Sequence, residues 1–131
     1  MINVEMPNYK LVMRCSDLTG DRVVNHADED LGKLDEIVVD VPTGRIAYAV
    51  LSFGGVLGFG DKSFAIPWSR LTFDRAREVF ILDVDKGTLE KAPGFDKNNW
   101  PDMSSKEWGE QIHSHYGTPP YWEIEPPMRG I

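Results

Sequence analysis

The sequence predicts a mainly β protein: a small barrel of about five or six mostly antiparallel strands, followed by a short C-terminal helix and an extended tail. Two observations carry this prediction. From Arg22 onward, apolar and polar residues alternate in short runs, which is the two-residue period of half-buried strands. Clusters of turn-forming residues separate these runs at short intervals. The length of 131 residues, with 41% hydrophobic and 27% charged, suits one globular domain with its own core.

The first two expected strands are joined by a polar turn. Residues 22–25 read RVVN, and the stretch HADEDLG that follows supplies the turn chemistry. The second strand, 33–41, reads KLDEIVVDV and alternates so that three aliphatic side chains share one face: Ile37, Val39 and Val41. The segment PTG at 42–44 then reverses the chain. We therefore expect a hairpin in which these three side chains share one face and Glu36 and Asp40 point the other way.

The next three strands complete the barrel. Residues 45–53, RIAYAVLSF, are apolar on both faces, which predicts a central strand covered on both sides. Residues 63–68, SFAIPW, form a strand that ends at Pro67 or lies at an edge, because proline donates no ladder hydrogen bond. Residues 77–84, REVFILDV, alternate again after the polar stretch DRAR.

The alternation stops after Asp85. Residues 89–103 contain two prolines and Trp100, and we expect an ordered loop held by aromatic side chains. Residues 104–117 predict a helix: Ser104 and Glu107 have the spacing of a capping box, and three aromatic or aliphatic side chains recur every fourth residue, Trp108, Ile112 and Tyr116. Gly117 ends the helix, and the proline-rich tail from residue 118 is expected to be extended.

The stretch FGGVLGFGDKS at 53–63 resembles the phosphate-binding loop G-x-x-x-x-G-K-[ST], with Asp61 inserted before Lys62. A phosphate loop needs a helix that begins at the lysine, and the following residues alternate like a strand instead. We interpret the stretch as a glycine-rich connection between two strands. The alternative is an enzyme that binds a phosphate or nucleotide ligand through residues 54–62.

The net charge of −7 comes mostly from residues 21–40, which hold seven carboxylates against Arg22 and Lys33. This balance argues against direct nucleic-acid binding. A calcium loop that began at Asp28 would need glycine at its sixth position and glutamate at its twelfth, and these positions hold Lys33 and Val39. We expect a solvated turn there and no metal site.

The histidine and cysteine patterns predict no catalytic, cofactor or metal residue. His113 and His115 lie two positions apart on the expected helix, so they point about 200° from one another and do not chelate. We expect one to face solvent and the other to lie at the helix boundary. Cys15 has no partner for an internal disulfide and is expected to be a small, partly buried thiol. With no secretory signal or membrane-spanning apolar run, we expect a cytoplasmic, soluble chain without membrane insertion.

Apolar side chains beside the glycines either fold back onto the core or mark a contact surface. The candidate interaction surface comprises these glycines, their apolar neighbours and three tryptophans: Phe53, Gly54, Gly55, Leu57, Phe59, Trp68, Trp100 and Trp108. Another role is open to the C-terminal aromatics. Trp100, Trp108, Tyr121 and Trp122 could instead cover the open face of the barrel.

Residues 21–74 resemble the PRC-barrel family, the β-barrel shared by the cytoplasmic part of the photosynthetic reaction-centre H subunit and the carboxy-terminal domain of RimM. The resemblance rests on G-x-x-V from Gly20, LGKLDEIVVD, TGRIAYAVLSFGG and FAIPWSRL. Residues 89–117 resemble the extension of its stand-alone bacterial members. The resemblance implies a compact, mostly antiparallel barrel that serves protein association rather than catalysis. It divides the chain into an N-terminal segment, 1–17, a PRC-barrel domain, 18–88, and a packed loop, helix and tail, 89–131.

The expected function is a non-catalytic protein interaction or assembly module that binds a protein partner and self-associates, with a homodimer as the expected state. Two alternatives stay open: the phosphate- or nucleotide-ligand enzyme, and a peripheral adaptor at a membrane complex. The acidic balance opposes binding to anionic lipid.

Overall fold

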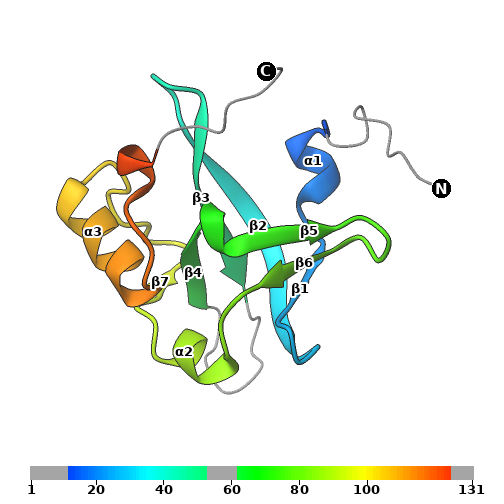
Figure 1. Ribbon diagram of the computed structural model, residues 1–131. Helices are drawn as coiled ribbons and strands as arrows, with labels where there is room; N and C mark the ends of the chain where they lie inside the picture. Colours follow the sequence, from blue (N-terminus) through cyan, green and yellow to red (C-terminus); the bar gives the residue numbers. More distant parts are fainter. Residues whose placement is uncertain (1–11, 53–61, 125–131) are drawn as a thin grey trace.

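The computed structural model describes residues 12–52 and 62–124 (Figure 1). Seven strands form one sheet: β1 Arg22–Val24, β2 Asp30–Asp40, β3 Arg45–Ser52, β4 Lys62–Pro67, β5 Leu71–Asp74, β6 Val79–Leu82 and β7 Phe95–Asp96. Their order is β5-β6-β1-β2-β3-β4-β7. All neighbours are antiparallel except β1 and β6, which run parallel. The mainly β, mostly antiparallel fold is confirmed, and no ladder among the described residues closes the sheet between β5 and β7.

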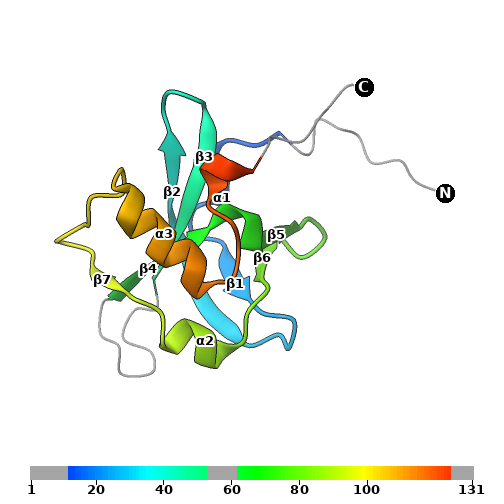
Figure 2. The ribbon, with the colours of Figure 1, turned by 60° about the vertical axis from the view of Figure 1, so that its left-hand side comes forward.

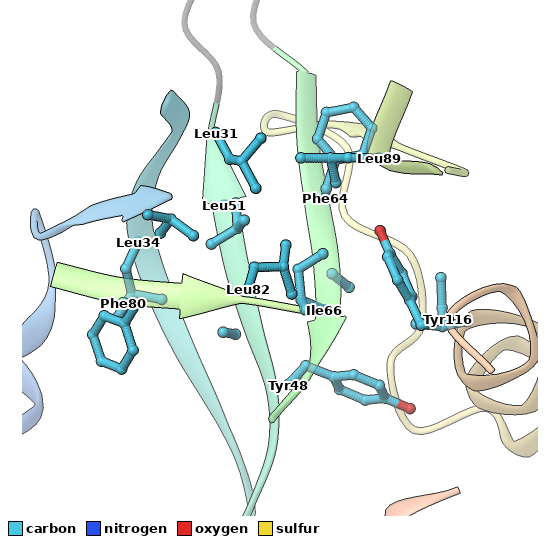
Figure 3. Packing of buried hydrophobic residues seen from close by; sticks show 14 of the residues in the cluster. Leu31, Leu34, Tyr48, Leu51, Phe64, Ile66, Phe80, Leu82, Leu89 and Tyr116 are labelled. Atoms are coloured by element: carbon cyan, nitrogen blue, oxygen red, sulfur yellow. The ribbon is translucent and has the colours of Figure 1, made fainter. Parts of the chain in front are cut away.

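β3 lies inside the sheet, as its sequence predicts. It pairs with β2 on one side and β4 on the other, and five consecutive residues, Ala47 to Leu51, are buried. Leu51 faces Leu34 of β2 and Phe64 of β4, and these side chains meet Leu82 and Phe80 in the core (Figure 3). A strand covered on both faces needs apolar residues at odd and even positions, which explains its unbroken apolar run.

β2 begins at Asp30, within the stretch expected to be a turn, and Leu31 is fully buried. Its far end departs from prediction. Val39 is 44% exposed and Val41 is 83% exposed, so two of the three aliphatic side chains expected on one face remain in contact with solvent. β1 pairs with β2 only as far as Lys33, and the β2–β3 hairpin continues beyond the other strands (Figure 1). The valines therefore extend past the elements that would cover them.

Two short strands were not predicted. β5 pairs with β6 as a hairpin across the polar stretch DRAR, and β7 pairs with the first two residues of β4. β4 itself ends at Pro67, as expected, and a 3₁₀ turn, η3 at Trp68–Arg70, leads into β5. Both unexpected strands lie at the sheet ends, where a few residues complete a ladder without a long alternating pattern.

Three helices accompany the sheet: α1 Cys15–Leu18, α2 Lys86–Glu90 and α3 Lys106–His115. α2 was not predicted and begins at Asp85, whose carboxylate accepts a hydrogen bond from the Thr88 N–H. The N-cap of α3 is Ser105 rather than Ser104, because the Ser105 hydroxyl accepts from the Trp108 N–H at 3.2 Å. Gly117 follows α3 with φ 66°, a conformation that favours glycine, and it ends the helix as expected.

Figure 2 shows α3 and the segment that follows it on one side of the molecule. α3 packs on β4, and its buried residues include Ile112, with Tyr116 at its C-cap. The segment after α3 contains a 3₁₀ turn, η4 at Tyr121–Glu123, so the part of the tail that the structure describes is not simply extended.

Candidate interaction surface

An apolar groove of about 250 Å³ lies where α1, β3 and the β5–β6 hairpin meet. It is lined by six apolar side chains and one cation: Met13, Leu18, Ile46, Trp68, Phe73, Phe80 and Arg75. The Phe80 ring forms its inner wall, with the ring centroid of Phe73 at 4.9 Å and that of Trp68 at 5.9 Å. Trp68 and Phe73 are half-buried, so their remaining surfaces face outward.

One of the exposed large apolar side chains, Met13, lines this groove. In the part of the chain that the structure describes, five large hydrophobic residues are exposed: Val12, Met13, Val39, Val41 and Trp100. Met13 lines the groove and Val12 precedes it. Val39 pairs with Ile46 across the β2–β3 ladder, and directly opposed residues place their side chains on the same face of a sheet. Met13 thus belongs to the groove, whereas Val39 and Val41 line a second cavity. We call the surface formed by the groove residues the groove face.

The end of β2 also borders a second cavity of about 340 Å³, together with Asp40, Met103, Ser104 and Tyr121. Polar groups fix this side of the hairpin. The Tyr121 hydroxyl donates to Asp40 Oδ2 at 2.7 Å, and the Arg45 guanidinium donates to the carbonyl of Ile124. Burial and the Asp40 carboxylate raise the pKa of Tyr121 to about 12, and the same hydrogen bond lowers the pKa of Asp40.

The three tryptophans of the predicted surface, Trp68, Trp100 and Trp108, lie in different places. Phe53, Gly54, Gly55, Leu57 and Phe59 lie outside the described residues. Of the three tryptophans, Trp68 belongs to the groove, whereas Trp100 contacts Phe95 of β7, with 5.1 Å between the ring centroids. Trp108 packs edge-on against Tyr48 at 5.1 Å. The sequence analysis did not identify Met13, Leu18 and Phe73 as residues of a contact surface. The apolar residues Leu71 and Phe73, which alternate with Thr72 beside a turn, were a weak sequence signal for the strand that carries Phe73.

Tyr48 is the centre of an aromatic cluster that joins the sheet to the C-terminal segment. Its ring meets Trp108, His113 and Tyr121, with centroid distances of 5.1, 5.4 and 5.8 Å. Gly109 lies so close that a Cβ there would be 2.6 Å from the Tyr48 hydroxyl oxygen and 2.9 Å from the Trp122 ring. The covering role proposed for Trp108, Tyr121 and Trp122 therefore matches their contacts, and Trp100 lies elsewhere.

His113 is buried, so the expectation of a solvent-facing histidine is wrong, whereas His115 is the last residue of α3 and lies at the helix boundary as expected. Its Nε2 accepts a hydrogen bond from the Tyr121 N–H at 3.1 Å, and its Nδ1 lies 2.7 Å from the Gly109 carbonyl. An acceptor at Nε2 requires the proton at Nδ1, which donates to Gly109. Burial lowers the pKa of His113, and this favours the neutral ring. His115 points elsewhere and contacts the Thr88 carbonyl at 2.9 Å.

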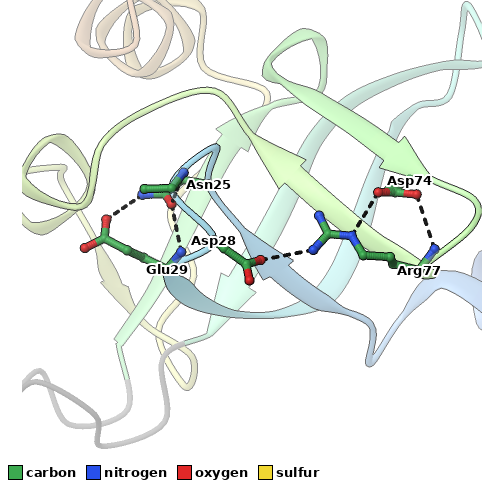
Figure 4. Close-up of polar contacts among 6 residues, drawn as sticks. Asn25, Asp28, Glu29, Asp74 and Arg77 are labelled. Carbon is green, nitrogen blue, oxygen red and sulfur yellow. Dashed lines mark hydrogen bonds and ion pairs between the residues drawn. The ribbon is translucent and has the colours of Figure 1, made fainter.

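The acidic turn is held by its own polar contacts (Figure 4). The Asn25 amide donates to Glu29 and its carbonyl oxygen accepts from the Glu29 N–H, while Arg77 bridges Asp28 and Asp74. Asp28 has φ 63°, a turn conformation that aspartate tolerates. These contacts explain why the turn is rich in polar and acidic residues: their side chains hold the turn in place.

Groups suited to catalysis are sparse in the described ranges 12–52 and 62–124. There, no three His, Cys, Asp or Glu side chains gather as they would around a metal ion. A cavity of about 300 Å³ beside His26 contains Glu29, Asp83 and Asp85, and His26 Nε2 lies 3.4 Å from Asp83 at an exposed position. Lys62 is the first residue of β4, so the lysine of the glycine-rich stretch enters a strand rather than a helix N-terminus. Cys15 is exposed, which corrects the expectation of a partly buried thiol.

None of the helices in residues 12–52 and 62–124 combines the length and apolar character needed to cross a bilayer. No curated protein matches the chain. The family model of the PRC-barrel domain matches residues 11–89, more than half of the sequence. This range contains the groove, strands β1 to β6 and the acidic turn. Members of this family are small β-barrel modules that commonly mediate protein interactions and are generally non-catalytic. The sequence match and the mostly antiparallel sheet agree, and the chain belongs to the PRC-barrel family.

Proposed function

We propose that this chain is a non-catalytic protein interaction or assembly module, and that the groove face is its contact surface. The observation that supports this most strongly is the apolar groove itself, in which Met13 is 42% exposed. Large apolar side chains left in water at one place mark contact surfaces, whereas scattered ones do not. The half-buried rings of Trp68 and Phe73 add aromatic surface, which is enriched in protein interfaces.

The proposed module comprises residues 18–88, with residues 89–131 as its C-terminal extension. Packing of α3 on β4 and of Trp108 on Tyr48 supports this division. We also propose a cytoplasmic location, for which the single cysteine gives support. Cell fractionation with a tagged chain tests the location directly.

Site-specific photo-crosslinking in the native host tests the contact surface. A photoreactive side chain at Met13, which is 42% exposed and lines the groove, would form discrete covalent adducts with protein. The matched control is Lys97, exposed in the loop after β7 and absent from the groove lining. Adducts at position 13 but not at position 97 support the proposal. Equal labelling at both positions, or none at position 13, would overturn it.

A further inference from the structure

We propose that residues 118–124, the C-terminal segment, form a pH-sensitive switch with α3. The segment closes on the helix while the His113 ring is neutral, and its middle part separates from the helix when the ring takes up a second proton. Figure 2 shows this segment beside α3, away from the open end of the sheet at β5. The inference does not depend on the groove or on the proposed function.

The His113 ring has one protonation state that fits the closed segment. Its Nε2 lies 3.1 Å from the Tyr121 N–H, a group that can only donate, so this nitrogen must be the acceptor. Nδ1 then carries the proton, 2.7 Å from the Gly109 carbonyl, which can only accept. In the doubly protonated ring, two donors would face each other at Nε2. The closed segment therefore requires the neutral ring.

The ring is held more firmly than the segment that covers it. His113 is 1% exposed within α3, and its ring packs against Tyr48 of β3 with 5.4 Å between the centroids. The C-terminal segment contributes no strand to the described sheet, Tyr121 and Trp122 are half-buried, and Glu123 is exposed. Protonation should therefore displace the segment rather than the ring.

Both ends of the segment are anchored, so the opening is confined to its middle. At its start, the Thr118 N–H donates to the His113 carbonyl at 3.1 Å. At its end, the Tyr121 hydroxyl and the Ile124 carbonyl bind the β2–β3 hairpin, which is a separate element from α3. The backbone between these anchors can leave the ring while the chain stays attached.

Two buried polar groups of the closed cluster gain from the opening. The Tyr48 hydroxyl and the Trp122 indole N–H are buried without a hydrogen-bond partner among the described residues. A buried polar group without a partner costs free energy, and contact with water recovers it. The Trp122 ring lies 5.7 Å from the His113 ring, so separation at His113 admits water beside it. The loss of one hydrogen bond therefore shifts the balance toward the open segment.

The groups that face the ring set the pH range. The phenols of Tyr48 from β3 and Tyr121 from η4 stay neutral, because burial raises the pKa of both. The Glu123 carboxylate of η4 favours the charged ring, but burial outweighs it and lowers the pKa of His113. β4, on which α3 also packs, has Lys62 as its one charged residue, exposed at the first position of the strand. The segment should open below about pH 6.5, the ordinary histidine value.

Hydrogen exchange of the Tyr121 amide, followed by NMR between about pH 7.5 and about pH 5.5, tests the switch. After correction for the intrinsic effect of pH, its exchange rate should rise about tenfold per pH unit between 6.5 and the lower pKa of the closed ring, because opening binds one proton. The amides of β3 should exchange more slowly at every pH, since the sheet stays folded. Equal rates for Tyr121 and β3, or a Tyr121 rate without this rise, would overturn the switch.

Two histidine variants identify the titrating group. His113→Gln places a neutral donor and acceptor at this position, so the rise should disappear. His115→Gln is the matched control, because this ring, at the end of the same helix, contacts the Thr88 carbonyl instead; the rise should persist. A rise that survives in His113→Gln would contradict the switch. If that variant does not fold, the wild type decides: the Tyr121 amide and the His113 ring must titrate with one midpoint, and two different midpoints would overturn the inference.

Discussion

The Tyr121 N–H donates a hydrogen bond to Nε2 of the buried His113 at 3.1 Å, and this contact joins η4 to α3. Nδ1 of the same ring donates its proton to the Gly109 carbonyl. A second proton would have to bind at Nε2, where it would point at the Tyr121 N–H and replace the hydrogen bond with a repulsive contact. The groups around the ring are Tyr48, Tyr121, Trp122 and the carboxylate of Glu123. Glu123 favours the charged ring, but burial outweighs it and lowers the pKa.

Stability should therefore fall as the pH drops below about 6.5, the ordinary histidine value. Between that value and the lower pKa of His113 in the folded chain, the unfolded chain binds more protons, so the free energy of unfolding rises with pH. Chemical denaturation across this window measures the slope. His113→Gln should reduce it, and Gln111→Ala, at an exposed position of the same helix, should not. An identical slope in wild type and His113→Gln would contradict the burial argument.

Gly109→Ala should destabilise the fold by about 2 kcal/mol, since a Cβ at this position would overlap the Tyr48 hydroxyl and Trp122. The better helix propensity of alanine offsets only part of this cost. The matched control is Gly87→Ala in α2, where the nearest atom would lie at 3.5 Å, an ordinary contact. It should leave stability unchanged or raise it. Urea denaturation of both variants gives the comparison, and equal effects would contradict the close packing.

Tyr121→Phe should raise the pKa of Asp40 toward its ordinary value, because the Tyr121 hydroxyl is the main cause of the lowered pKa. Carboxyl chemical shifts followed by NMR against pH measure this directly. Tyr116→Phe is the control: the Tyr116 hydroxyl is buried without a hydrogen-bond partner among the described residues. The control should leave the Asp40 titration unchanged and retain stability. An Asp40 pKa that does not respond to Tyr121→Phe would rule out this hydrogen bond in solution.

Cys15 should react with a thiol reagent in the folded chain as readily as an unstructured cysteine, because it is exposed on α1. Comparison of Ellman's reagent under native and denaturing conditions gives the ratio of rates, expected to be close to one. A strong delay under native conditions would show that α1 is covered in solution.

The long strands could be predicted because each has a local pattern. The unbroken apolar run of β3 predicts a strand covered on both faces, which is confirmed, and the alternation at 77–84 predicts a strand, which forms as β6 at Val79–Leu82. β5 and β7 could not be predicted from short sequences, since their ladders depend on partners already in place. The resemblance to the PRC-barrel family added the expectation of a compact, mostly antiparallel barrel, which periodicity alone leaves open.

The groove was beyond sequence reasoning because it joins residues far apart in the chain. Met13 precedes α1, Ile46 begins β3 and Phe80 lies in β6, and only the folded sheet brings them together. Val39 and Val41 have the alternation of core residues, but the hairpin continues past its cover. Periodicity shows which face a side chain is on, whereas its burial depends on what lies opposite.

The assignment of the groove as a contact surface is tested most directly by photo-crosslinking from two exposed positions, one in the groove and one outside it. Met13 lines the groove and is 42% exposed, and Trp100 is 41% exposed but contacts β7. A photoreactive side chain at position 13 should form discrete adducts with protein, and the same side chain at position 100 should not. Adducts at position 100 with none at position 13 would contradict the assignment of the groove as the contact surface.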